Sequence, residues 1–304
     1  MQTIQLEKQC TPRLQTIPLK PRPEETVVAA VDTSSMKIGE TDTGTLIAVR
    51  GANVWKQKRS YRYLRLGPFI FHITEENRKE VYNALQKAHF NPIHQSSHQS
   101  SASLFQIQTR IASLLERWLQ EALSKKLSNG LILFDGSLTS GTADAPTQRM
   151  TKMLSTARKG GNVILAFSKM TCLRLNGYRI TDLLPKHKPP YLLQMAGIKP
   201  NPPLAFLGDI YVARLTRGNC AFRLDIDKEI SLERRIEAVE KLLGNDLLSQ
   251  SYPEALRLAH IFCTFTANEV IAMQRFIARR HRLRIVNRPD MHRLLFGPFG
   301  KGER

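Results

Sequence analysis

Acidic side chains are scarce in this chain of 304 residues, which holds 26 Asp and Glu against 45 Lys and Arg. The resulting formal net charge is +19 and the pI is about 10.1. Such a surplus disfavours cationic partners and favours a polyanion, because Lys and Arg that contact phosphates release counterions. Nucleic acid is therefore the favoured partner. The alternative is that the charge only keeps the protein soluble.

Long apolar segments are also missing. The sequence has no run of 18 apolar residues and no apolar core of a secretory signal. A bilayer-spanning helix needs about 20 predominantly apolar residues, and export needs such a signal. We therefore expect a cytoplasmic protein without membrane association.

Cysteine is rare, and no two of the four cysteines lie two to four residues apart. Zinc knuckles are built from such close pairs, so the cysteine pattern does not indicate a structural zinc site. Free thiols are typical of cytoplasmic proteins, and we expect all four to be reduced.

What the sequence does contain is two short apolar runs that each end in an aspartate. Residues 26–31 (TVVAAV) precede Asp32, and residues 131–134 (LILF) precede Asp135. Runs of this kind are typical of strands buried on both faces, which would place both carboxylates at the rim of a sheet. Burying two carboxylates is costly unless a cation meets them. The pair therefore predicts a shared divalent metal and phosphoryl-transfer chemistry. The alternative for each is an aspartate that caps the following turn.

The remaining elements follow from hydrophobic periodicity and from turn residues. We expect residues 1–25 to form an extended arm and the proline-rich residues 183–203 to form an irregular insertion. The strands are predicted at 26–31, 44–55, 63–73, 131–134 and 162–167, with a hairpin at 208–227, and the helices at 75–90, 104–127, 146–158, 231–243 and 253–282. A three-stranded meander followed by strands separated by helices is the plan of the ribonuclease H-like fold. The predicted class is thus α/β, with a mixed sheet flanked by helices and further helices at the C-terminus.

A third carboxylate is expected from the helix before Asp135. Glu116 and Glu121 both qualify, because they flank the apolar stripe of that helix on opposite sides. Periodicity leaves this choice open, and a surface glutamate is the alternative for each.

Two cationic or titratable side chains could join these carboxylates. Pro253 fits the first position of a helix, so Tyr252 precedes this helix and His260 lies two turns inside it on the same side. An imidazole beside carboxylates favours manganese over magnesium. Lys169 follows the strand at 162–167, from where its ammonium group could steady a scissile phosphate. A structural histidine and a surface lysine are the alternatives.

A basic segment with interleaved tyrosines connects the second and third strands. Lys56, Lys58, Arg59 and Tyr61 combine cations for phosphate contact with a ring for base stacking. They are candidate nucleic-acid-binding residues, and a solvated hairpin tip is the alternative.

Four motifs together resemble the NurA nuclease family over about residues 26–284. They are 31–35 (VDTSS), 134–138 (FDGSL), 168–169 (SK), and Tyr252-Pro253 with His260 eight positions after the tyrosine. In the first motif, Thr33 stands where the family commonly has a glycine.

The resemblance implies a function. It implies a ribonuclease H-like domain over residues 26–304 that acts as a manganese-dependent DNA nuclease, with Mg²⁺ as an alternative metal. It further implies a nucleoid-associated homodimer that resects DNA ends with a HerA-type hexameric ATPase in double-strand-break repair, as an exonuclease and single-strand endonuclease.

The resemblance also assigns roles to residues. Asp32, Asp135 and His260 would be metal ligands, and Glu116 is favoured over Glu121 as the fourth. Tyr252 would lie beside the metals, and Lys169 completes the candidate catalytic set. The main alternative is a catalytically inactive subunit of the same fold that binds DNA or docks a partner. A transposase-like strand-transfer enzyme is disfavoured, because no separate DNA-binding module is present.

Overall fold

The computed structural model describes residues 13–89, 104–142, 144–175 and 177–286, and the chain forms two compact units. Unit 1 comprises residues 1–34, 50–67 and 112–264, and unit 2 comprises residues 35–49, 68–111 and 265–304. Each of the long strands β2 (Val28–Glu40), β3 (Gly44–Gln57) and β4 (Ser60–Thr74) contributes one part to each unit.

A nine-stranded mixed sheet has the strand order β1-β10-β12-β13-β7-β5-β2-β3-β4. The central neighbours β2, β5 and β7 are parallel, and β1, β10, β12, β13 and β7 pair antiparallel in turn. Its strands are β1 (Arg13–Pro18), β2 (Val28–Glu40), β3 (Gly44–Gln57), β4 (Ser60–Thr74), β5 (Leu131–Asp135), β7 (Val163–Ser168), β10 (Tyr191–Ala196), β12 (Gly208–Arg214) and β13 (Phe222–Asp227).

Helices and three short strand pairs complete the described part of the chain. The helices are α1 (Arg78–His89), α2 (Leu104–Lys126), α3 (Thr147–Lys159), the single turn η1 (Ile180–Asp182), α4 (Leu232–Asn245), α5 (Glu254–Cys263) and α6 (Ala267–His281). The short pairs are β6 (Thr139–Ser140) with β11 (Ala205–Phe206), β8 (Arg174–Leu175) with β9 (Tyr178–Arg179), and β14 (Leu248–Ser249) with β15 (Tyr252–Pro253). None of the helices in these ranges is long and apolar enough to cross a membrane.

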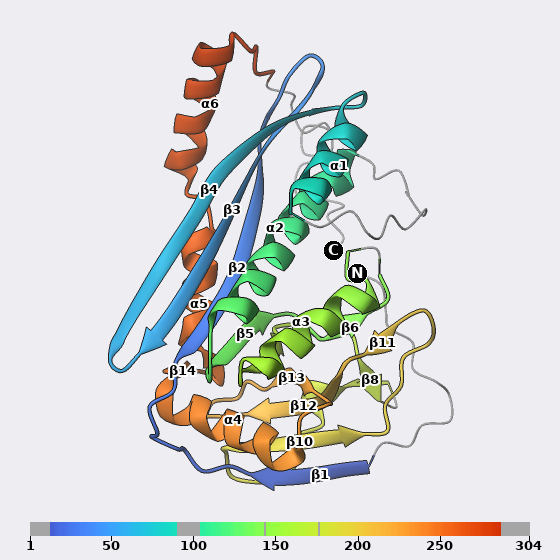
Figure 1. Ribbon diagram of the computed structural model, residues 1–304, viewed down its shortest axis with the longest axis vertical. Coiled ribbons are helices and arrows are strands. Elements are labelled where there is room, and N and C mark those ends of the chain that lie inside the picture. Colours follow the sequence, from blue (N-terminus) through green and yellow to red (C-terminus); the bar gives the residue numbers. More distant parts are fainter. Residues whose placement is uncertain (1–12, 90–103, 143, 176, 287–304) are drawn as a thin grey trace, which may run out of the picture. The chain divides into compact units, whose positions relative to one another are not determined.

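In unit 1, helices cover both faces of the sheet, because alternate residues of each central strand point to opposite sides. Leu131 and Leu133 of β5 belong to a core cluster that also contains the apolar faces of α4 and α5. Ile132 and Phe134 belong to a second cluster with α3, which crosses the sheet in Figure 1. The continuous apolar run of β5 is thus explained by burial on both faces.

In unit 2, α6 packs through one side on parts of β2 and β3. Ile277 of α6 lies in a core cluster with Ile38 and Leu46, and Val270 packs against the same cluster. The amide Nε2 of Gln274 donates a hydrogen bond to the carbonyl oxygen of Ile38. These contacts fix which side of α6 is buried.

The ribonuclease H-like plan predicted from the sequence is confirmed, but three local predictions were wrong. Asp32 does not end its strand: β2 continues to Glu40 beside β3, and only its pairing with β5 stops at Val31. The single helix predicted at 253–282 is two helices, because Thr266 begins α6 with a capping box to Glu269.

The third correction concerns the proline-rich residues 183–203, where the sequence predicted irregular backbone. Tyr191–Ala196 form β10, an interior strand of the sheet that pairs with β12 and β1. The prolines flank this apolar segment without interrupting it, so its backbone N–H groups remain available for pairing. Residues 13–18 of the predicted N-terminal arm form β1, the edge strand next to β10.

Candidate metal centre

Two carboxylates from adjacent parallel strands form the centre of the candidate site in unit 1. Val31 of β2 pairs with Phe134 of β5, so Asp32 and Asp135 follow at equivalent positions on neighbouring strands. Asp32 is 7% exposed, and burial raises the pKa of its carboxyl group, as does the negative charge of Asp135. Asp135 is partly exposed, with 24% of its side chain accessible. Two neighbouring carboxylates of which one is buried need a positive charge to offset their repulsion and the desolvation of the buried one.

His260 of α5 contacts the first of these carboxylates. Its Nδ1 lies 2.7 Å from Oδ2 of Asp32, and this hydrogen bond lowers the pKa of Asp32 against the effect of burial. The backbone N–H of Thr33 donates to the other oxygen, Oδ1, at 2.7 Å. The imidazole side chain is 54% exposed. The histidine predicted from the Tyr252 spacing is therefore placed at the acidic centre.

Glu116 of α2 supplies a third carboxylate. Burial raises the pKa of Glu116 to about 7, while the positive charge of Arg117 acts in the opposite direction. The negative charges of Asp32 and Asp135 raise this pKa further, which places the three carboxylates within electrostatic reach of one another. Nε2 of Gln120 donates a hydrogen bond of 2.9 Å to Oε1 of Glu116 and holds the side chain in place.

Glu121, the other glutamate that the sequence left open, has a different partner. Its carboxylate forms an ion pair with Arg149 of α3. The two glutamates thus lie on different flanks of α2, and Glu116 is the one that shares the electrostatic environment of Asp32 and Asp135.

Lys169 lies at the same rim of the sheet. Its Nζ is 2.7 Å from Oδ2 of Asp135, and Asp135 pairs with Phe167 two residues before the lysine. The ammonium group also lies 5.5 Å from the ring centroid of Tyr252. One cation is therefore present beside the carboxylates, but it is 39% exposed and able to move toward an incoming anion.

Tyr252 brings a buried hydroxyl to the centre. Its ring packs on Phe222, with 5.2 Å between the centroids, and its hydroxyl has no hydrogen-bond partner among the described residues. Burial raises the pKa of Tyr252, and the charges of Asp135 and then Asp32 raise it further, so the hydroxyl remains a donor. An unsatisfied buried donor beside carboxylates fits a site that takes up further oxygen atoms, such as those of a phosphate or of water on a metal.

Cys263 is a neighbour that the sequence did not predict. One ligand atom from each of Asp32, His260 and Cys263 lies within 4.8 Å of the others. Burial raises the pKa of the Cys263 thiol, which donates a hydrogen bond of 3.2 Å to the carbonyl oxygen of His260. The sequence feature that indicates this neighbour is the three-residue spacing between His260 and Cys263, which places both side chains on one side of α5.

The four candidate nucleic-acid-binding residues lie at the hairpin between β3 and β4. Lys58 and Arg59 form its exposed two-residue turn. The hydroxyl of Tyr61 donates a 2.6 Å hydrogen bond to Asp246, and Lys56 lies 5.2 Å from its ring centroid. Tyr61 is therefore engaged by protein groups on both its hydroxyl and its ring. In the described ranges, no hydrogen bond or ion pair joins these four residues to the acidic centre.

The described part of the chain thus combines a ribonuclease H-like sheet with three carboxylates, an imidazole and a lysine at one rim, and this donor set fits a divalent cation. Comparison with known proteins identifies a related family. Residues 26–160 match the model of the NurA domain family. The predicted resemblance to the NurA family is confirmed over these residues, and the match supports a nuclease.

One of the similar solved structures shows the same fold. The NurA nuclease from Sulfolobus solfataricus superposes with a TM-score of 0.55 at 15% identity, and the similarity covers 88% of each chain. A structure of NurA bound to dAMP and manganese gives a TM-score of 0.49 at 11% identity, covering 86% of this chain and 90% of that one. Endonuclease V from Bacillus subtilis gives 0.41 at 14% identity, with 87% of each chain covered. A comparison with curated protein sequences finds no match.

The family match covers only part of the site. Asp32, Glu116 and Asp135 lie within residues 26–160, whereas Lys169, Tyr252 and His260 follow later in the chain. The fold brings the two groups together, since Lys169 contacts Asp135 and His260 contacts Asp32. The site therefore depends on elements from most of unit 1.

Proposed function

We propose that this chain is a DNA nuclease of the NurA type that hydrolyses phosphodiester bonds with divalent metal, preferentially manganese. The observation that carries the proposal is the pair of neighbouring carboxylates Asp32 and Asp135. Asp32 is buried, and the negative charge of Asp135 raises its pKa, while His260 contacts Asp32 and Lys169 contacts Asp135. Such a pair is costly to maintain without a cation of higher charge.

The donor set fits this metal. Asp32, Glu116, Asp135 and His260 would hold it, offering three carboxylates and one imidazole. Carboxylate oxygens accept both magnesium and manganese, and an imidazole nitrogen shifts the preference toward manganese. When bound, divalent metal would lower the pKa of an attacking water and stabilise the leaving oxygen.

The other side chains act on the phosphate. The Lys169 ammonium, which lies at the rim beside Asp135, would bind a non-bridging phosphate oxygen and neutralise the charge that grows as the ester bond breaks. The Tyr252 hydroxyl donates to a second oxygen and thereby gains the partner that it lacks. In the reaction, an oxygen of water forms a bond to phosphorus while one P–O ester bond breaks, leaving a phosphomonoester and a hydroxyl.

The biological setting proposed here extends the resemblance to the NurA family. We propose that DNA ends are the substrate, in double-strand-break repair, and that the protein acts as a homodimer with a HerA-type hexameric ATPase. The net charge of +19 supports the DNA partner. Cleavage of linear DNA that is stimulated by such an ATPase, but not by an ATPase variant unable to hydrolyse ATP, would test this partnership.

The direct test of the proposed function is DNA cleavage by the purified chain. End-labelled linear duplex and single-stranded DNA are incubated with manganese, magnesium or EDTA. We expect cleavage with manganese, less with magnesium and none with EDTA. Asp135→Asn removes one negative charge and should lower turnover by a factor of about a thousand or more.

A matched control removes the same charge elsewhere. Asp42 is exposed in the turn between β2 and β3, so Asp42→Asn should cleave like the wild type. Wild-type turnover by Asp135→Asn would contradict the metal site. A wild-type chain that binds DNA but cleaves none with any metal would support the inactive-subunit alternative.

A further inference from the structure

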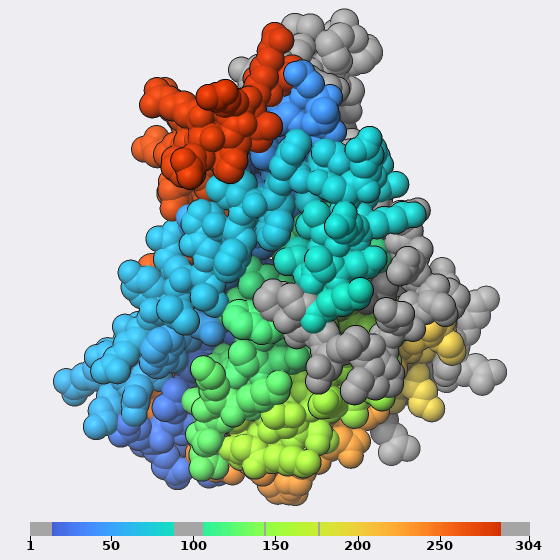
Figure 2. Space-filling model, turned by 45° about the horizontal axis from the view of Figure 1, so that its top comes forward, coloured from blue at the N-terminus to red at the C-terminus, as the bar shows by residue number. Residues whose placement is uncertain are grey.

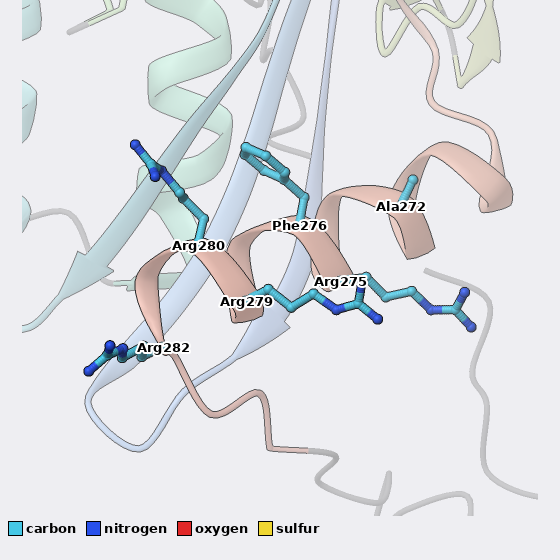
Figure 3. A pocket seen from close by; sticks show the side chains of 6 residues that line it. All are labelled: Ala272, Arg275, Phe276, Arg279, Arg280 and Arg282. Carbon is cyan, nitrogen blue, oxygen red and sulfur yellow. The ribbon is translucent and has the colours of Figure 1, made fainter.

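Helix α6 in unit 2 carries an exposed arc of arginines around one phenylalanine. Figure 3 shows the side chains of this arc. Arg275 and Arg279 extend to one side of the helix, and Phe276 and Arg280 project from the adjoining side. The α6 arc comprises Ala272, Arg275, Phe276, Arg279, Arg280 and Arg282. In Figure 2 the side chains of α6, coloured orange-red, lie exposed on the face of the molecule that is shown.

The arc lies opposite the buried side of the helix. Val270 and Ile277 belong to or pack on the unit 2 core, whereas Phe276 is 64% exposed. With 3.6 residues per turn, the residues of the arc fall on the solvent side together. A large aromatic ring is therefore displayed among cations and is not packed into the core.

In the part of the chain that the structure describes, neighbouring acids do not neutralise the charges of the arc. Within the described ranges, no ion pair involves Arg275, Arg279, Arg280 or Arg282, although other arginines such as Arg158 and Arg257 are paired. The acidic residue of α6, Glu269, is engaged in the capping box at the start of the helix. A basic last turn is common because it complements the helix dipole, but that accounts neither for Arg275, about one turn earlier, nor for the exposed ring.

We propose that the α6 arc binds single-stranded nucleic acid, with the arginines contacting phosphates and Phe276 stacking on a base. Arginines four residues apart are separated by about 6 Å along the helix, which suits neighbouring phosphates of an extended strand. Surfaces that bind single strands combine these two elements, a cationic track and an exposed aromatic platform.

Other polyanionic ligands fit the arc less well. A duplex hides the faces of its bases in the stack, so it would leave Phe276 unused. Binding to an anionic membrane requires a continuous apolar face, and the apolar face of α6 is occupied by the unit 2 core. The exposed ring within a basic surface thus selects a ligand with accessible bases.

The inference rests on the proposed function in that the ligand is a nucleic acid, but the arc is separate from the metal centre. The carboxylates belong to unit 1 and the α6 arc to unit 2. The arc would hold a strand without cutting it. Binding can therefore be measured in EDTA, where hydrolysis does not contribute.

The test uses the full chain and a fluorescent oligothymidylate of 15 nucleotides, with anisotropy followed over a range of salt concentrations in EDTA. The combined variant Arg275→Gln, Arg279→Gln and Arg280→Gln should lose at least about tenfold in affinity, and the slope of log K against log salt should shrink by about 2, since each phosphate contact to a single strand contributes about 0.7. The matched control Lys125→Gln, Lys126→Gln and Lys152→Gln removes three exposed charges from α2 and α3. It should keep the wild-type slope. An equal loss in both triple variants would overturn the proposal, because the effect would then follow net charge alone.

A second variant tests the ring. Phe276→Ala should lower the affinity by about fivefold or more with the salt slope unchanged, because stacking releases no counterions. Phe276→Tyr, which keeps an aromatic ring, should bind like the wild type. An abasic oligomer of the same length should not distinguish Phe276→Ala from the wild type.

Two outcomes would reject this assignment. Wild-type binding by Phe276→Ala would remove the stacking role. Loss of binding to phosphatidylserine vesicles in the α6 variants, with oligothymidylate binding retained, would assign the arc to a lipid surface. Loss of the far-ultraviolet helical signal would indicate unfolding, and Phe276→Tyr then supplies the folded comparison. Binding is measured in EDTA and does not depend on cleavage, so failure of the nuclease tests and failure of this one are distinguishable.

Discussion

The raised pKa of Glu116 makes the stability of the metal-free protein depend on pH in a predictable direction. Its carboxyl group has a pKa of about 7 in the folded chain, against an ordinary value of 4.5. Because the folded state holds the proton more tightly, this group stabilises the fold below pH 4.5, and the contribution is lost as pH rises through 7. Glu116→Gln replaces the carboxyl group with a neutral amide that can still accept the hydrogen bond from Gln120.

The size of the effect follows from the shift in pKa. Each pKa unit corresponds to about 1.4 kcal/mol, so the rise in the pKa of Glu116 from 4.5 to about 7 corresponds to roughly 3 kcal/mol. This is an upper limit, since the side chain is only partly buried. At pH 8, Glu116→Gln should therefore raise the melting temperature of the metal-free protein by about 5–10 °C, whereas at pH 4.5 the two proteins should melt together.

The assay is thermal unfolding in EDTA at a series of pH values, followed by circular dichroism. Manganese should raise the melting temperature of the wild type at pH 8, because the cation offsets the negative charge of Glu116. It should raise the melting temperature of Glu116→Gln much less, because this variant lacks that charge. Glu121→Gln is the control: it loses the ion pair with Arg149 and should gain no stability at pH 8. Identical pH profiles for the wild type and Glu116→Gln would refute the reasoning.

Three further predictions concern the same centre and the charged surface. Tyr252→Phe should leave the melting temperature of the metal-free protein unchanged or slightly higher, because the hydroxyl has no partner there, and should lower turnover by about tenfold or more; equal turnover would remove the donor role. His260→Ala should weaken manganese-supported cleavage far more than DNA binding, as seen in a manganese titration. A lower melting temperature with unchanged manganese dependence would instead make His260 a structural residue. DNA affinity should fall about tenfold or more between roughly 50 and 200 mM salt, and salt-insensitive binding would indicate a small-molecule substrate.

The parts of the fold that the sequence predicted are those with a local signal. The run before Asp135 is apolar on both faces of its strand, and this burial is visible in the order of residues alone. The strand Tyr191–Ala196 was missed because prolines on both sides outweighed its apolar content, and only tertiary pairing reveals it. The break before α6 had a readable signal, Thr266 followed three residues later by Glu269, which was overlooked inside a long apolar-periodic segment.

The candidate site likewise has residues that a local sequence pattern predicts and residues whose role depends on tertiary packing. Asp32 and Asp135 were predicted from strand ends, although β2 continues beyond Asp32. The choice between Glu116 and Glu121 depends on which flank of α2 faces α3, and this is set by packing and not by periodicity. The orphan hydroxyl of Tyr252 is a property of three-dimensional surroundings, so no sequence pattern could have indicated it.

The pairing of β1 with β10 has a consequence for how the chain folds during synthesis. Pro18 of β1 pairs with Tyr191 of β10. β1 is synthesised before β10, so it remains without its partner until the ribosome has released the residues of β10. At 5–20 residues per second, this interval is on the order of ten to thirty seconds. Pairings of such long range are slow to form, because the entropy of closing the intervening loop is lost before any contact compensates for it. β1 therefore stays unpaired until late in synthesis. Until then its backbone N–H and C=O groups are open to pairing with other nascent chains.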